Sequence, residues 1–188
     1  RFKAARNSLS KFKQEAEKRA KASGSDGTEI RHRTELQYEF GMGLLEQALA
    51  NHKGAKAHFD KAQAKATAKV GGKLRDTHNA WLAHISNASN ALRSKQLTDA
   101  DAFLRKAKTL GDANPGFMNA ERKVRFSLYL AEADLLRGET AAAREAVDAV
   151  LARAGEDKSP KTVARALMLR SRLDELKAME ISDKHGFK

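Results

Sequence analysis

Histidine is the residue of this chain best suited to bind a metal ion, so the spacing of the histidines decides whether the sequence predicts a metal site. His52 and His58 are six residues apart, and so are His78 and His84. This spacing puts the two members of each pair on different faces of a helix, whereas a helical zinc pair needs histidines at i and i+4. The other two histidines, His32 and His185, stand alone in the sequence. We therefore expect no metal site.

The residues that carry nucleophilic or acid–base chemistry are absent or lack the neighbours they need. The chain contains no cysteine and no Gly-x-Ser-x-Gly elbow. Adjacent carboxylates such as Asp174 and Glu175 are explained by solvated charge on a helix surface. Gly71-Gly72-Lys73 lacks the spacing and the preceding strand of a phosphate-binding loop. The sequence predicts no catalytic residue, no cofactor and no enzyme activity.

Lysine and arginine are the remaining candidates for a functional surface. The net charge is +12, and half of it, by direct count, lies within residues 1–33. A second concentration follows a predicted helix at 55–69 and its flanks, and we call it the basic ridge: Lys53, Lys56, Lys61, Lys65, Lys69, Lys73 and Arg75. The ridge predicts either a surface for an anionic partner, nucleic acid or acidic protein, or simply a solvated helix face. No stacking aromatics are interleaved among these lysines, so the sequence gives little support for single-strand binding.

Residues 1–22 form a basic amphipathic segment that the sequence predicts to be helical. Phe2, Leu9 and Phe12 fall on one face, with lysine and arginine elsewhere. Such a helix lies on an anionic membrane, lies in a partner's groove, or covers the end of its own domain. The Gly- and Ser-rich stretch that follows predicts a linker over 23–33.

The rest of the chain has the composition of a helical protein. It is rich in alanine, lysine, arginine and glutamate, has only two prolines, and shows no sustained strand-type alternation. We expect an all-α fold of about eight helices, with a helical domain over 34–180 and a tail over 181–188. In the last helix we expect four residues to face inward: Val163, Leu167, Leu173 and Leu176.

A pattern of one large residue between two small ones recurs in the second helix of successive predicted hairpins. The three sets are Ala55-Phe59-Ala62, Ala100-Leu104-Ala107 and, more loosely, Ala143-Val147-Val150. A small residue stands twelve positions before each set, at Gly43, Ala88 and Ala131. Over roughly residues 34–155 this pairing resembles the tetratricopeptide-repeat family. The sets are 45 and 43 residues apart, against about 34 in that family, and the family's aromatic residue at the start of the first helix is not consistently present.

The resemblance implies antiparallel helical hairpins stacked as an α-solenoid that binds a peptide or helix on the concave surface lined by the first helices. The corresponding groove residues are Phe40, Leu44, Gln47, Ile85, Ser89, Leu92, Leu128 and Glu132. This set is mostly apolar and lacks the residues with which the family clamps a C-terminal carboxylate. We expect Leu92→Glu to abolish partner binding with little loss of stability.

The functional expectation is a non-enzymatic, bacterial scaffold that mediates protein–protein interaction in the assembly of a multiprotein complex. Two alternatives stay open: a basic helical protein that binds nucleic acid through phosphate contacts, and a membrane-surface-associated assembly factor that uses residues 1–22. The sequence contains no apolar run of membrane-spanning length. The compartment is left open between the cytoplasm and, if a segment precedes Arg1, a membrane-tethered or periplasmic location. Partner identity and oligomeric state are open as well.

Overall fold

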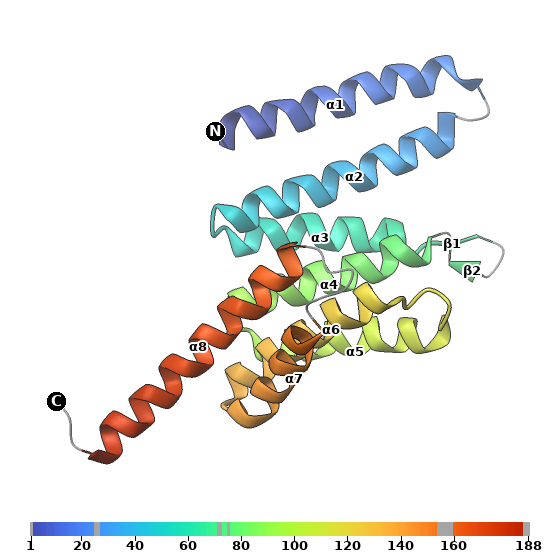
Figure 1. Cartoon of the computed structure of the whole chain (residues 1–188). Coiled ribbons are helices and arrows are strands. Elements are labelled where there is room, and N and C mark those ends of the chain that lie inside the picture. Colours follow the sequence, from blue (N-terminus) through green and yellow to red (C-terminus); the bar gives the residue numbers. More distant parts are fainter. Residues whose placement is uncertain (1, 25–26, 71–72, 75, 154–159, 186–188) are drawn as a thin grey trace. The chain divides into compact units, whose positions relative to one another are not determined.

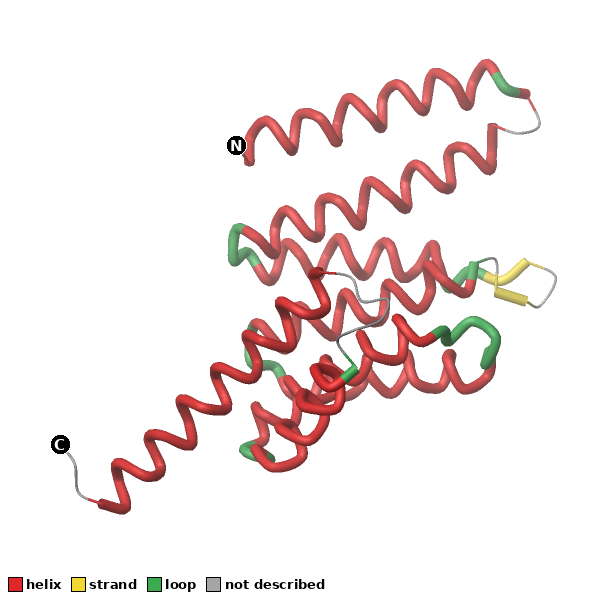
Figure 2. Tube along the Cα trace, viewed as in Figure 1, coloured by secondary structure: helices red, strands yellow, loops and turns green. Residues whose placement is uncertain are grey.

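The structure, a computed structural model, describes residues 2–24, 27–70, 73–74, 76–153 and 160–185. Eight α-helices and one pair of two-residue strands account for nearly all of these residues (Figure 2). The all-α expectation of about eight helices is therefore confirmed. The chain divides into two compact units, residues 1–110 and residues 111–188, which we describe separately.

Unit 1 contains four helices and most of a fifth: α1 (Phe2–Ala22), α2 (Gly27–Ala48), α3 (His52–Ala66), α4 (Thr77–Arg93) and α5 (Leu97–Ala113). Each helix runs opposite to the one before it, so that consecutive helices form antiparallel hairpins (Figure 1). The strands β1 (Lys69–Val70) and β2 (Lys73–Leu74) pair antiparallel between α3 and α4. The sequence did not predict this pair, because two residues are too few to show a period-two pattern.

The first helix packs against the second instead of extending as a free arm. The Leu9 side chain lies against Gly41, where a Cβ would come 2.7 Å from its Cδ2 atom. Gly27 closes the other end of the hairpin, where a Cβ would lie 2.1 Å from the carbonyl oxygen of Ala20. Arg6 forms an ion pair with Glu46. Of the arrangements considered for residues 1–22, the described contacts are those of a helix that covers its own unit.

The linker expected over 23–33 is too long. α2 begins at Gly27, so that residues 27–33 form its first two turns. Ser23 and Gly24 lie between the helices, and Gly24 has a positive φ of 55°. Glycine is required at position 27, the first residue of α2, because the close approach of Ala20 leaves no room for a side chain.

The contact between α2 and α3 depends on one glycine and one phenylalanine. Phe59 is buried against α2, and a Cβ on Gly43 would lie 2.4 Å from Cε1 of its ring. Ala55 and Ala62 flank the ring on α3 and are fully buried in the same cluster. Gly43 of α2 and the large Phe59 of α3 therefore fit together.

Amide side chains fix α4 against α3. The Asn90 side chain donates to the carbonyl oxygen of His52 at 2.9 Å, and its Oδ1 lies 3.2 Å from His52 Nδ1. The Asn87 amide donates to Oε1 of Gln63 at 3.1 Å. Asn87 and Asn90 are both buried, and the bonds pair both polar atoms of Asn90 and the amide nitrogen of Asn87, while Oδ1 of Asn87 has no partner among the described residues.

Unit 2 consists of α6 (Ala120–Arg137), α7 (Thr140–Ala152) and α8 (Pro160–His185) packed around one apolar cluster. Gly138, with φ 83°, ends α6 in the left-handed conformation expected of a C-cap glycine. The cluster joins all three helices, for example through Leu128, Val147 and Leu173. Leu167 of α8 was expected to face inward, but it is 53% exposed, so that prediction is wrong.

The small–large–small sets are buried in all three hairpins. The nine residues of the sets and the three small residues that precede them are all buried: Gly43, Ala55, Phe59, Ala62, Ala88, Ala100, Leu104, Ala107, Ala131, Ala143, Val147 and Val150. Small residues on both sides of a large one allow two helices to approach closely while the large side chain fills the space between them. The repeated sequence pattern therefore marks residues that are buried in each hairpin, and between Gly43 and Phe59 the close approach itself is observed.

Candidate functional site

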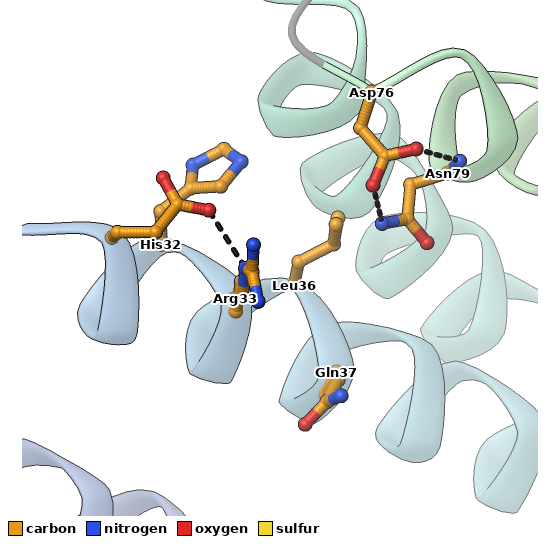
Figure 3. Close-up of a pocket in the computed structure, with 7 residues that line it drawn as sticks. His32, Arg33, Leu36, Gln37, Asp76 and Asn79 are labelled. Atoms are coloured by element: carbon orange, nitrogen blue, oxygen red, sulfur yellow. Dashed lines mark hydrogen bonds and ion pairs between the residues drawn. The ribbon is translucent and has the colours of Figure 1, made fainter.

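A polar cleft of about 410 Å³ in unit 1 lies between the first turns of α2 and the start of α4 (Figure 3). Seven residues line it: Glu29, His32, Arg33, Leu36, Gln37, Asp76 and Asn79. The first five lie on α2, while Asp76 and Asn79 form the N-terminus of α4. No residue of α3 or α5 lines the cleft, although both helices belong to the same unit.

Hydrogen bonds hold the polar side chains on both walls of the cleft. Arg33 Nε donates to Oε1 of Glu29 at 2.7 Å, one helical turn away on α2. On the opposite wall Asp76 caps α4, because its Oδ1 accepts from the backbone N–H of Asn79 at 3.0 Å. Its Oδ2 accepts from the Asn79 side-chain amide at 2.6 Å. Asp76 is therefore the N-cap residue of α4.

The chemistry available in the cleft is recognition by hydrogen bonds. Arg33, Gln37 and Asn79 offer donors, while carboxylates on both walls offer acceptors. Both oxygens of Asp76 accept hydrogen bonds within the cap, an arrangement typical of a structural group rather than a catalytic base. Among the described residues no group of three or more histidines and carboxylates is placed to hold a metal ion.

The eight residues predicted for the groove do not form one accessible surface. Five of them are buried, namely Phe40, Ile85, Ser89, Leu92 and Leu128, and Leu128 belongs to the core of unit 2. Glu132 is tied to Arg165 of α8 by an ion pair. Leu44 is 56% exposed and Gln47 is half-buried, so within unit 1 only the α2 part of the predicted surface stays accessible.

The cleft lies on the same face of α2 as that accessible part. Arg33, Gln37, Phe40 and Leu44 follow one another at spacings of four, three and four residues, which places them along one side of the helix. Sequence reasoning missed the cleft because it assigned residues 23–33 to a linker. Glu29 and Arg33, which form an i,i+4 ion pair, were the signal that this stretch is helical.

The basic ridge is partly neutralised by the protein's own carboxylates. Lys56 forms an ion pair with Asp60 at 2.8 Å, and Lys65 forms one with Glu35 of α2. The hydrogen bond from Lys65 lowers the pKa of Glu35 below its ordinary value. Lys53 and Lys61 are exposed and form no ion pair with any residue that the structure describes. The side chains of Lys69 and Lys73, and Arg75 as a whole, lie outside the described residues.

One buried titratable side chain in unit 1 makes stability depend on pH. His84 of α4 is buried, and its Nδ1 has no hydrogen-bond partner among the described residues. Burial and then the nearby Lys106 lower the pKa of His84 below its ordinary value of 6.5. The unfolded chain therefore binds a proton more readily than the folded one.

We expect the free energy of unfolding to be greatest above about pH 6.5 and to fall as the pH drops below it, by up to about 1.4 kcal/mol per pH unit from this residue. His84→Gln, which cannot take up the proton, should flatten this dependence. Urea unfolding of both proteins at about pH 7.5 and about pH 5.5 measures the difference. Equal slopes for the two proteins would mean that His84 is not responsible.

None of the described helices combines the length and the apolar character that crossing a membrane requires.

Comparison of this chain with protein-family models, with curated proteins and with solved structures found no match in any of the three.

Proposed function

We propose that this chain is a non-enzymatic helical adaptor that binds a segment of a protein partner in the cleft between α2 and α4. The observation that supports the proposal is which helices supply the residues that line the cleft. All seven residues come from α2 and the start of α4, which the tetratricopeptide-like register takes as the first helices of two successive hairpins. In stacked helical hairpins the first helices line one continuous surface, the usual site of partner binding. The tetratricopeptide-like register assigned from the sequence is part of this proposal.

The face of α2 indicates what kind of segment fits. Arg33 and Gln37 offer hydrogen-bond donors at the polar end of the face, and the buried Leu36 also lines the cleft. Leu44 offers an exposed apolar surface two turns further on. A partner segment that suits this face has a polar stretch whose backbone groups form hydrogen bonds in the cleft. It is followed by an apolar side chain that packs on Leu44.

A bulky substitution within the cleft tests the proposal. Gln37 is exposed, so Gln37→Trp should fill the cleft and leave the fold intact. We expect it to lower recovery of the partner by about tenfold or more, since losing one well-placed contact region costs at least about 1.4 kcal/mol. The measurement is affinity capture from a native lysate at moderate salt after nuclease treatment, quantified by mass spectrometry.

Gln14→Trp is the matched control, because Gln14 is the same residue type, exposed, on the neighbouring helix α1 and away from the cleft. It should recover the same proteins as the wild-type chain. If Gln37→Trp and Gln14→Trp recover the partner proteins equally, the cleft is not the binding site.

A second candidate function, nucleic-acid binding, is favoured by the distribution of charge between the units. Residues 1–110 contain 22 Lys and Arg against 11 Asp and Glu, a net charge of +11, whereas residues 111–188 carry 14 against 13, or +1. Phosphate contacts release counterions, so this binding weakens steeply as salt rises. The same capture without nuclease distinguishes the two candidate functions. If nucleic acid is recovered at low salt but not at higher salt, and no protein is recovered after nuclease treatment, nucleic-acid binding replaces the adaptor proposal.

A further inference from the structure

Helix α8 exposes a stripe of four residues that neither the core of unit 2 nor the proposed cleft uses. Met168, Arg172, Glu175 and Met179 follow one another at spacings of four, three and four residues, so they lie along one side of the helix. Met168 is 73% exposed and Met179 is 62% exposed, more than any other large apolar side chain that the structure describes. The buried side of α8, with Ala166, Leu169 and Leu173, points elsewhere. We call these four residues the α8 stripe.

The two charges in the middle of the stripe form no ion pair with the described residues, although other charges on α8 do. Arg165 pairs with Glu132 of α6, and Arg170 pairs with Asp148 of α7 at 2.6 Å. Arg172 and Glu175 are exposed and form no ion pair with any residue in the described part of the chain. An opposite pair of charges between two exposed methionines is therefore available to a partner.

The order of these residues makes the stripe complementary to itself. When a second α8 runs antiparallel, with the two-fold axis passing between positions 173 and 174, Met168 of one copy lies opposite Met179 of the other. In the same register Arg172 lies opposite Glu175, and the symmetry repeats both contacts. A parallel pair would instead place Arg172 against Arg172 and Glu175 against Glu175, which is unfavourable.

The charge along the whole helix favours the same orientation. Residues 160–172 contain four Lys and Arg and no Asp or Glu, whereas residues 173–185 contain four Asp and Glu and two Lys. This order opposes the helix dipole, which favours acidic residues near the N-terminus and basic residues near the C-terminus. Arg165 and Arg170 are paired within unit 2, whereas Lys161 and Arg172 form no ion pair with any described residue. An antiparallel second copy brings this basic half of α8 beside an acidic half.

We infer that the α8 stripe is a self-association surface, and that two copies of this chain pair through it as an antiparallel, two-fold symmetric dimer. The neighbouring exposed row of α8, which contains Leu167 and Ile181, does not offer this match. In an antiparallel register that brings Leu167 opposite Ile181, Asp174 would lie opposite Asp174 of the second copy, and the two negative charges would repel each other. One helix pair is a small interface, so we expect association to be weak and dependent on concentration.

Charge exchange within the stripe tests the inference with the full chain. Sedimentation velocity from micromolar to millimolar protein should show wild-type dimers, and Arg172→Glu or Glu175→Arg alone should remove them. An equimolar mixture of these two variants should dimerise again, because their stripes carry opposite charges. Lys177→Glu, an exposed change of the same charge type on the other side of α8, should leave the dimer unchanged. Circular dichroism melting curves show that each variant stays folded.

Engineered cysteines test the orientation, because the chain contains no cysteine of its own. Under oxidation, a mixture of Met168→Cys and Met179→Cys should form disulfide-linked dimers, while each variant alone should form far fewer. Efficient cross-linking of each variant with itself would indicate a parallel pair and would overturn the inference. A wild-type chain that stays monomeric at every concentration, or a dimer that Arg172→Glu and Glu175→Arg leave unchanged, would overturn it too.

Discussion

Replacing Phe59 by alanine is expected to lower the free energy of unfolding of unit 1 by about 3–5 kcal/mol. The ring is fully buried between α2 and α3, where it lies against the backbone at Gly43. Alanine would leave a cavity that two helices held by short connections cannot close. Trp81, the only tryptophan of the chain, is buried in α4 and reports the unfolding of this unit by its fluorescence in urea.

A second substitution at the same contact shows whether the fit, rather than the size of Phe59 alone, stabilises the hairpin. In the wild-type chain Gly43→Ala should be destabilising, because the new Cβ would lie 2.4 Å from the ring. In the Phe59→Ala background the same change should be stabilising, by about 1 kcal/mol, since alanine is the better helix former and the ring is gone. If Gly43→Ala has the same sign in both backgrounds, the close approach of α2 to Phe59 is not the determining contact.

Replacing Leu128 by glutamate is expected to unfold unit 2, with a cost of about 4 kcal/mol or more. Leu128 is buried in the apolar cluster of α6, α7 and α8, and the described residues of that cluster offer no partner for a charge. Hydrogen exchange, measured by mass spectrometry on peptides of α6 to α8, should show loss of protection across all three helices.

Leu44→Glu is the matched control for that variant, because both leucines belong to the groove that the sequence predicted. Leu44 is 56% exposed, so we expect its replacement to change the free energy of unfolding by no more than about 0.5 kcal/mol. Leu92 is buried like Leu128, so Leu92→Glu is now expected to destabilise the protein rather than to affect binding alone. Full protection of unit 2 in Leu128→Glu would contradict this assignment of the core.

The burial of the repeated sets could be predicted from the sequence because it follows from a local steric pattern. Alanines on both sides of Phe59 or Leu104 mark the side of a helix that a neighbour approaches closely, whichever neighbour it is. Capping signals are equally local: Asp76 at the start of α4 and Gly138 at the end of α6 are residue types that favour those positions. Such features depend on spacing within one or two helices, which a single sequence records directly.

The binding surface could not be predicted in the same way, because burial depends on elements that are distant in the sequence. Ile85 and Leu92 have the spacing of a helix face that packs on something, but the spacing does not distinguish a core from an open groove. The first turns of α2 were taken for a linker because Gly27 follows a Gly- and Ser-rich stretch. Only the close approach of Ala20 explains a glycine at the start of that helix.

The amide hydrogen bonds of α4 also determine how unit 1 responds to mechanical load. Sliding α4 along α3 by one helical turn, about 5.4 Å, would break the bonds of Asn87 and Asn90 together and leave buried amides unpaired. In unit 2, α7 and α8 are joined by partly exposed ion pairs, Arg170 with Asp148 at 2.6 Å and Arg144 with Asp174 at 2.7 Å, whose charges water can solvate when the helices shift. The α3–α4 pair should therefore resist shear as a stiff element, while the α7–α8 pair yields gradually.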